Sequence, residues 1–229
     1  MNQPLDPQAV ARQPTQQRAR ERFDRILEES EKLLLEVGLS GFSIPILAER
    51  LRYTRGSVYA YFPTHYAILN ELVRRYAAGL EAVFLEKGAE LQKLAWRESV
   101  AAVVDQAVHF HNSKPVARLL ILGGAVTDDS YRAQETMIKR LGDFARLIWK
   151  QKGLVLPDRQ PDVTTLATDI GTACFRRSYF ENGSITPAYR DAAVAAMIAF
   201  LEPWIEAAKS TTARAAAPKT TTRGKSKRT

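Results

Sequence analysis

The sequence is poor in cysteine and contains no long apolar run. Cys174 is the single cysteine among 229 residues, so the chain cannot form an internal disulfide, and we expect a reducing, cytoplasmic environment. No segment approaches the roughly 20 consecutive apolar residues of a membrane-spanning helix. The first residues are polar and include prolines, so we also expect no secretory signal. Together these features argue against secreted, disulfide-rich and membrane proteins.

Patterns that would indicate catalysis or a bound metal are missing as well. His109 and His111 are two residues apart, a spacing at which the two rings diverge on a helix and cannot easily share a metal. Gly123-Gly124 lacks a surrounding phosphate-loop pattern, and Asp128-Asp129 is typical of a turn. We therefore predict that the protein is not an enzyme and has no catalytic residue, metal site or cofactor.

The positive charge is concentrated at the C-terminal end. The chain has a formal net charge of +8, and residues 209–229 contain seven basic residues and no acidic one, which accounts for all but one of these charges. This segment is also poor in apolar residues, so we predict a disordered basic tail. Two roles remain open for it: an auxiliary contact with nucleic-acid phosphates, or a solubilising terminus without a specific partner.

The stretch from Ser43 to Leu69 predicts a helix-turn-helix followed by the start of a long helix. Ser43 is a candidate N-cap, and Thr54 is the candidate N-cap of the second helix. Pro63 ends the second helix, because a residue before proline is disfavoured in helical conformation. Apolar residues recur at helical spacing in both helices: Ile44, Leu47, Ala48 and Leu51 in the first, and Val58, Tyr61 and Phe62 in the second.

The second of these helices has an outer face of small residues. Gly56 and Ala60 point away from the face that carries Val58 and Phe62. Glycine inside a helix costs about 1 kcal/mol relative to alanine, so an offsetting benefit is expected. Spacing alone allows two interpretations: a tolerated glycine in an ordinary helix, or a helix whose backbone approaches the DNA major groove closely.

The same stretch resembles the DNA-binding signature of the TetR family of transcriptional regulators, which runs approximately I-A-x-x-A-G-V-S-x-G-T-x-Y-x-Y-F-x-x-K-x-x-L. The matching positions are Ala48, Thr54, Gly56, Ser57, Tyr59, Tyr61, Phe62 and Ile68. Two departures stand out. Leu51-Arg52-Tyr53 replaces the usual A-G-V turn, so Arg52 is expected to adopt a positive φ, and His65 replaces a lysine that contacts phosphate in the family.

The resemblance implies a DNA interface centred on the second helix. Arg55 is the expected base reader, because arginine can pair bidentately with guanine, and the hydroxyl-bearing residues and His65 suit phosphates. The predicted DNA-binding residues are Arg20, Ser43, Tyr53, Thr54, Arg55, Gly56, Ser57, Tyr59, Ala60, Tyr61 and His65. Arg20 is included because Arg18, Arg20 and Arg22 lie at the start of a helix, where the helix dipole disfavours positive charge.

That first helix is predicted over residues 17–38, with Gly38 as its stop. Its expected buried stripe is Phe23, Ile26, Leu27, Ser30, Leu33, Leu34 and Val37. The helix that starts at Thr64 should continue to about Lys87-Gly88. Further helices are predicted at 98–112, 115–126, 131–152, 163–181 and 187–209, with no strand pattern and no internal repeat.

We therefore predict an all-α fold with an N-terminal three-helix helix-turn-helix DNA-binding domain and a larger helical domain for ligand binding and dimerisation. The predicted segments are a disordered arm at 1–16, the DNA-binding domain at 17–77 with its helix-turn-helix at 42–61, the second domain at 78–208, and the tail at 209–229. In the resembling family the last two long helices pair with a second subunit. The small residues of the last two predicted helices suit that arrangement, and a tightly packed pair within one chain is the alternative.

The resemblance also implies a small-molecule inducer in the second domain. Its candidate lining residues are Trp96, His109, Phe110, Tyr131, Trp149, Phe175 and Tyr179, each of which is also compatible with an ordinary core position. The expected function is a cytoplasmic, homodimeric transcriptional regulator, more a repressor than an activator, that leaves a palindromic double-stranded DNA operator when the inducer binds. The competing hypothesis is a small-molecule sensor whose helix-turn-helix contacts protein instead of DNA.

Overall fold

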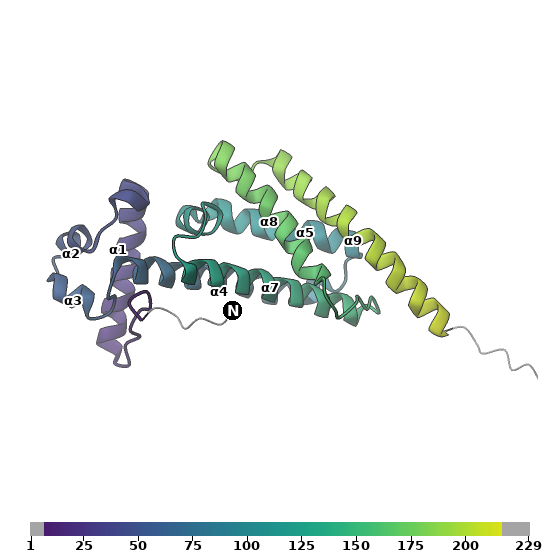
Figure 1. The fold of residues 1–229 in the computed structure, drawn as a ribbon, viewed down its shortest axis with the longest axis horizontal. Coiled ribbons are helices and arrows are strands. Elements are labelled where there is room, and N and C mark those ends of the chain that lie inside the picture. Colours follow the sequence, from purple (N-terminus) through teal and green to yellow (C-terminus); the bar gives the residue numbers. More distant parts are fainter. Residues whose placement is uncertain (1–6, 217–229) are drawn as a thin grey trace, which may run out of the picture.

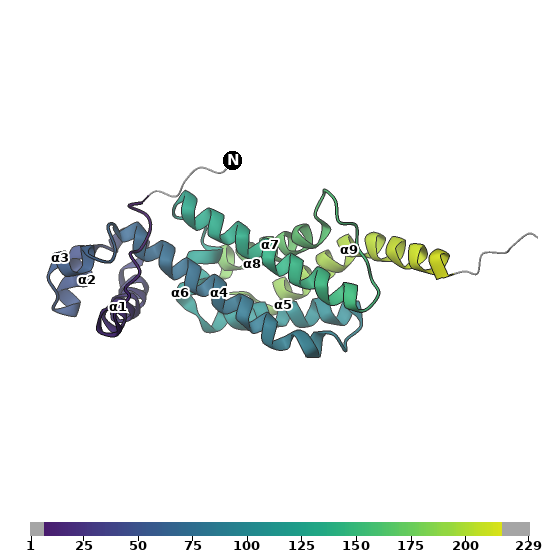
Figure 2. The same cartoon turned by 90° about the horizontal axis from the view of Figure 1, so that it is seen from below.

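The long helix α4 (His65–Leu91) connects the two parts of the molecule. The computed structural model describes residues 7–216, with side chains up to residue 210, and this part of the chain contains helices and no strand. Figure 1 shows α1 (Gln17–Gly41), α2 (Ile44–Leu51) and α3 (Arg55–Tyr59) gathered around the start of α4. The remaining helices pack along the rest of α4, as the view from below also shows (Figure 2).

The larger part is a helical bundle. Its elements are α5 (Trp96–Ser113), the short α6 (Pro115–Ala117), the π-helical turn η1 (Arg118–Leu122), α7 (Asp128–Gln151), α8 (Val163–Asn182) and α9 (Pro187–Ala216). The predicted all-α fold with an N-terminal helix-turn-helix is thereby confirmed. No helix within residues 7–216 has the length and apolar character needed to cross a bilayer.

The residues at the helix ends explain where most helices begin and stop. Two predictions near these ends were wrong: the burial of Val37 and the turn at Asp128-Asp129. Gly38 breaks α1 with φ 67°, as predicted, but Val37 is 41% exposed instead of buried because it lies next to this kink. Asp128-Asp129 forms the first turn of α7 instead of a separate turn. Thr127 caps that helix by accepting a hydrogen bond from the Ser130 amide at 3.1 Å, and the two carboxylates suit the positive end of the helix dipole.

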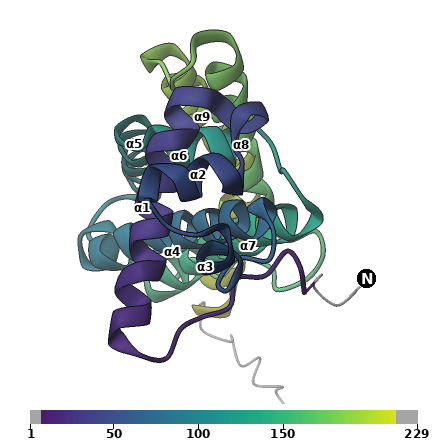
Figure 3. The same cartoon turned by 90° about the vertical axis from the view of Figure 1, so that its left-hand side faces the viewer.

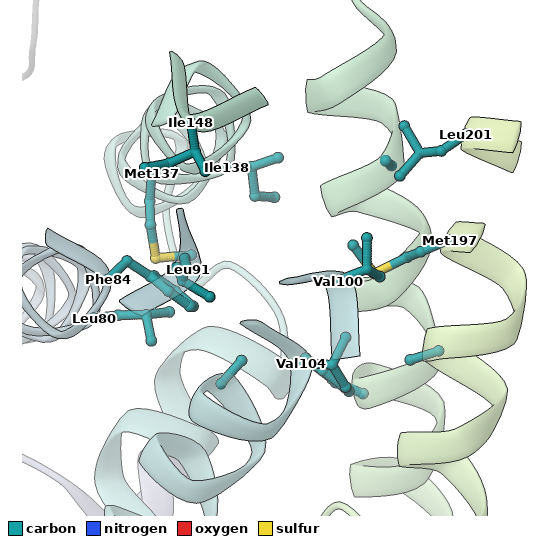
Figure 4. Packing of buried hydrophobic residues seen from close by; sticks show 14 of the residues in the cluster. Leu80, Phe84, Leu91, Val100, Val104, Met137, Ile138, Ile148, Met197 and Leu201 are labelled. Atoms are coloured by element: carbon teal, nitrogen blue, oxygen red, sulfur yellow. The ribbon is translucent and has the colours of Figure 1, made fainter. Parts of the chain in front are cut away.

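Two apolar cores meet along α4. Residues up to Val73 pack with α1–α3, whereas Ala77 and later residues pack inside the bundle (Figure 4). Val116 and Leu120 of the bundle nevertheless belong to the first core. Because the two parts share these contacts, a division of the chain between residues 77 and 78 stays a proposal.

The two chain ends differ from the predicted disorder where the structure describes them. Residues 8–12 lie against the helix-turn-helix region: the Ala9 carbonyl accepts a hydrogen bond from Asn70 Nδ2 at 3.0 Å, and the Arg12 amide donates to the Tyr61 carbonyl at 2.7 Å. At the other end, α9 continues through residues 209–216. The rest of the predicted arm and tail, residues 1–6 and 217–229, lies outside the described residues.

Candidate nucleic-acid interface

The turn between α2 and α3 uses a left-handed residue that is not glycine. Arg52 has φ 54° and ψ 38°, which confirms the predicted positive φ, and it is the one such non-glycine residue between 7 and 216. The turn is closed by a hydrogen bond from the Tyr53 amide to the Ala48 carbonyl at 2.9 Å. A left-handed conformation costs a residue with a Cβ roughly 1–2 kcal/mol, which the buried packing of α2 offsets. The turn thus fixes the angle at which α3 leaves α2.

Side-chain capping sets the start of α3. The Thr54 hydroxyl oxygen accepts a hydrogen bond from the Ser57 amide at 3.2 Å, which confirms Thr54 as the N-cap. The Thr54 and Ser57 hydroxyls also lie 2.8 Å apart and share a hydrogen bond. Ser43 occupies the N-cap position of α2 as predicted, but its side chain forms no capping hydrogen bond.

One side of α3 is anchored in the core and the other is open. Val58 and Phe62 are fully buried, and the Phe62 ring stacks on Phe23 with 4.6 Å between ring centroids. On the opposite side, five of the predicted residues are exposed: Thr54, Arg55, Gly56, Tyr59 and Ala60. Seen from its left-hand end, the molecule presents α2 and α3 to the viewer (Figure 3).

Gly56 is not required by the packing of the protein itself. A Cβ atom built on Gly56 would have no neighbour closer than Thr54 Oγ1 at 4.0 Å, and Gly56 does not have a positive φ. The protein could therefore accept alanine here and gain helix stability. Because the packing of the protein does not require glycine at this position, a binding partner that approaches the α3 backbone closely is the favoured explanation.

The charge around α3 suits an anionic partner. Residues 50–70 include Arg50, Arg52 and Arg55 and no acidic residue. Arg50 is held by Glu29 and Glu36 of α1, at 2.9 Å to a carboxylate oxygen of each, and so braces α2 against α1. Arg52 and Arg55 are exposed and form no ion pair with the described residues.

The other predicted DNA-binding residues are half-buried, except Arg20. The guanidinium of Arg22 lies over the Tyr53 ring at 5.3 Å, and Tyr61 packs its ring edge-to-face on Phe23 at 6.0 Å. His65 is half-buried, and its ring lies 4.0 Å from that of Tyr66. Arg20 is exposed at the start of α1, where its Nε donates to the Pro14 carbonyl at 3.4 Å.

The N-terminal segment adds a contact to this region that the sequence pattern did not indicate. The Gln8 carbonyl accepts a hydrogen bond from the Thr64 hydroxyl at 2.8 Å. Together with the Asn70 and Tyr61 contacts, this bond places residues 8–12 beside the turn between α3 and α4. Arg12 is exposed there and adds a cation next to α3. Ala9 and Ala11 are buried, but two alanines in a polar segment are too weak a signal to predict such packing.

A second candidate site lies inside the bundle. A cavity of about 80 Å³ is lined by residues of α4, α5, η1, α7, α8 and α9. Of the predicted ligand-binding residues, Trp149 and Phe175 line it. Trp96 and Phe110 are buried core residues outside it, Tyr179 is half-buried, and His109 and Tyr131 are exposed, so these five do not line the cavity. Exposure of His109 and Tyr131 follows from their positions on the solvent sides of α5 and α7.

The prediction missed His111, which lines this cavity. Its side chain is 3% exposed, and its Nδ1 has no hydrogen-bond partner. Burial lowers the pKa of His111 to about 4, with a smaller contribution from the positive charge of Arg118, so the ring is neutral at pH 7. His111 continues a helical stripe through Val100, Val104 and Ala107, and this periodicity could have identified it.

Known proteins share the helix-turn-helix and the overall fold described above. Residues 26–72 match the family described as bacterial regulatory proteins, tetR family. No curated protein sequence matches the chain. Among solved structures, a TetR-family transcriptional regulator from Streptomyces coelicolor is 19% identical with a TM-score of 0.63, and the match covers 80% of this chain and 99% of that one.

Two further solved structures are similar. A TetR-family transcriptional regulator from Pectobacterium atrosepticum is 18% identical with a TM-score of 0.55, over 84% of this chain and 98% of that one. The TetR-family regulator PfmR from Thermus thermophilus is 20% identical with a TM-score of 0.51, over 82% and 97%. Residues 26–72 thus match the TetR family, and the chain has the fold of the solved TetR-family regulators.

Proposed function

We propose that the protein is a transcriptional regulator that binds double-stranded DNA through α3. The observation that carries this proposal is the open outer face of α3, where Gly56 is unneeded by the protein's own packing. A major groove accommodates such a helix, and phosphates attract the surrounding arginines. Arg55 is the proposed base reader; Thr54, Ser57, Tyr59 and the flanking predicted residues are proposed to hold phosphates. This role is regulatory, not enzymatic, and belongs in the cytoplasm.

We also propose a homodimer formed through α8 and α9, which run side by side along one edge of the bundle (Figure 1). Leu166, Ala173 and Phe180 lie seven residues apart on α8 and are exposed, with Phe180 at 80%. On α9, the alanines at 188, 192, 195 and 199 are exposed at helical spacing. An unpaired apolar face of this kind marks a protein contact. Two recognition helices are also needed for adequate affinity for DNA.

A charge on this face should separate the subunits. We expect Phe180→Asp to convert the dimer to a monomer, because the variant loses the apolar contact of the phenyl ring and brings a charge into the interface. Sedimentation velocity measures the change. Leu85→Asp, which introduces the same charge at a 68% exposed leucine of α4, should leave the dimer intact. A wild-type protein that is monomeric at micromolar concentration would refute the proposed interface.

The cavity provides a route for control by a small molecule. Leu80 and Phe84 of α4 line the cavity, and Leu69 and Leu72 of the same helix pack in the core beneath α3. A ligand that shifts α4 would therefore move the DNA-binding region and change the spacing of the two recognition helices. A differential affinity of a few kcal/mol between the two states suffices for such a switch. We propose that the ligand releases the protein from a palindromic operator, as a repressor requires.

Electrophoretic shift on the promoter upstream of the protein's own gene tests the DNA-binding proposal. We expect Arg55→Ala to relax base preference by about 1–3 kcal/mol at the contacted base pair, because a bidentate contact is lost. Tyr59→Phe should weaken binding to all sequences alike, because a phosphate contact carries no sequence information. Absence of any shift at low salt would favour the alternative, a small-molecule sensor whose helix-turn-helix contacts protein.

A further inference from the structure

The walls of the bundle cavity exclude a charged ligand. No lysine, arginine, aspartate or glutamate lines the cavity among the described residues. The walls offer no carboxylate to pair with a cation and no cationic side chain to pair with an anion. Arg118, whose charge acts on His111, does not line the cavity. Burying an unpaired charge in such surroundings costs many kcal/mol. The occupant that the walls accept is therefore uncharged and mainly apolar.

The polar groups on the walls have few free donors. The Ser99 hydroxyl donates to the Trp96 carbonyl at 2.7 Å and accepts from Trp149 Nε1 at 3.1 Å. The other three hydroxyls also donate within the protein: Thr164 to Asp162 at 3.1 Å, Thr168 to the Thr164 carbonyl at 3.0 Å, and Thr172 to the Thr168 carbonyl at 2.9 Å. These hydroxyls offer lone pairs to a ligand and no proton.

His111 is the exception. Its ring is buried, it lines the cavity, and its Nδ1 has no partner among the described residues. An unpaired buried polar atom costs about 1–3 kcal/mol, and a ligand that pairs with it recovers this free energy. A neutral imidazole carries one N–H donor and one nitrogen acceptor, and either can be at Nδ1. A hydroxyl group can satisfy both forms, because it donates and accepts.

We propose that the cavity binds a small, uncharged, mainly apolar molecule whose single hydroxyl group hydrogen-bonds the ring of His111. Binding follows from the cavity itself; the role of this molecule as the effector of DNA release rests on the proposed function. The cavity of about 80 Å³ is smaller than the roughly 150 Å³ known to accept benzene, so its walls must yield. Met137 and Met197 extend into the space between the helices (Figure 4), and their unbranched side chains can adapt to a ring.

Four molecules that share one aromatic ring test the proposal: phenol, toluene, benzoate and benzylamine. Each is titrated calorimetrically at pH 7.5 into the full-length wild-type protein without DNA. We expect phenol to bind, and benzoate and benzylamine, which are charged at this pH, to show no binding. Binding of either charged molecule as tightly as phenol, or no binding of phenol, would overturn the proposal.

A variant isolates the contribution of His111. We expect His111→Phe to weaken phenol binding about tenfold and to leave toluene binding nearly unchanged, because a planar aromatic ring stays at this position and only the hydrogen bond is lost. His109→Phe, at the exposed histidine two residues earlier, should leave both affinities as in the wild type. If His111→Phe changed the affinities for phenol and toluene equally, the proposed hydrogen bond between phenol and His111 would be contradicted. Because these titrations contain no DNA, their result is independent of whether α3 binds an operator, which the shift assay decides.

Discussion

Replacement of Gly56 by leucine is expected to weaken DNA binding at least about tenfold without destabilising the protein. Gly56 is exposed on α3, and an added Cβ meets no atom closer than 4.0 Å. Leucine has the higher helix propensity by up to about 1 kcal/mol, so the free energy of unfolding should stay the same or rise. The same side chain would separate the α3 backbone from the groove. Fluorescence anisotropy with labelled promoter DNA measures binding, and urea denaturation measures stability.

A matched substitution separates this effect from general surface change. Ala78 is an exposed small residue of α4 outside the proposed interface, and Ala78→Leu should bind DNA like the wild type. If Gly56→Leu binds the promoter with wild-type affinity, the outer face of α3 does not contact the groove. If it unfolds the protein, Gly56 has an internal role that its open surroundings do not indicate.

Phe62→Ala is expected to cause the largest loss of stability, about 3–5 kcal/mol in the free energy of unfolding. The Phe62 ring is completely buried and stacks on Phe23 at 4.6 Å, directly behind the exposed face of α3. Its removal leaves a cavity between α1, α3 and α4, so DNA binding should be lost as well. Urea denaturation followed by circular dichroism measures the change.

Leu85→Ala serves as the control for this substitution. Leu85 is 68% exposed, and truncation of an exposed side chain normally changes stability by no more than about 0.5 kcal/mol. A loss below about 1 kcal/mol in Phe62→Ala would show that Phe62 does not anchor α3 in the way the geometry indicates.

The helix-turn-helix could be predicted in detail because its geometry is set by neighbouring residues. Thr54 caps α3 through the amide three residues later, and the turn requires a positive φ, which Arg52 must adopt because no glycine is present there. The stop at Gly38 is of the same kind. In each case the determining interaction spans only a few residues, so the pattern contains the information.

Contacts between distant segments were not predictable in this way. Asn70 connects the N-terminal segment with the start of α7: its Nδ2 donates to Ala9, and its Oδ1 accepts from Thr127 at 2.7 Å. No periodicity links these three residues. The residues that line the cavity were incompletely predicted for a related reason. The choice between His109 and His111 depends on which side of α5 faces the bundle, and aromatic character alone does not reveal that side, whereas the apolar stripe from Val100 does.

Selection of bound sequences from a random double-stranded DNA library tests the central claim most directly. The full-length protein should enrich a two-fold symmetric motif with two half-sites, because two α3 helices related by the dimer axis read the groove. Arg55→Ala should enrich the same symmetric spacing with weaker preference at one or more positions of each half-site. Failure to enrich any sequence at low salt, or enrichment of a single unsymmetric site that Arg55→Ala leaves unchanged, would contradict DNA recognition by a dimer through α3.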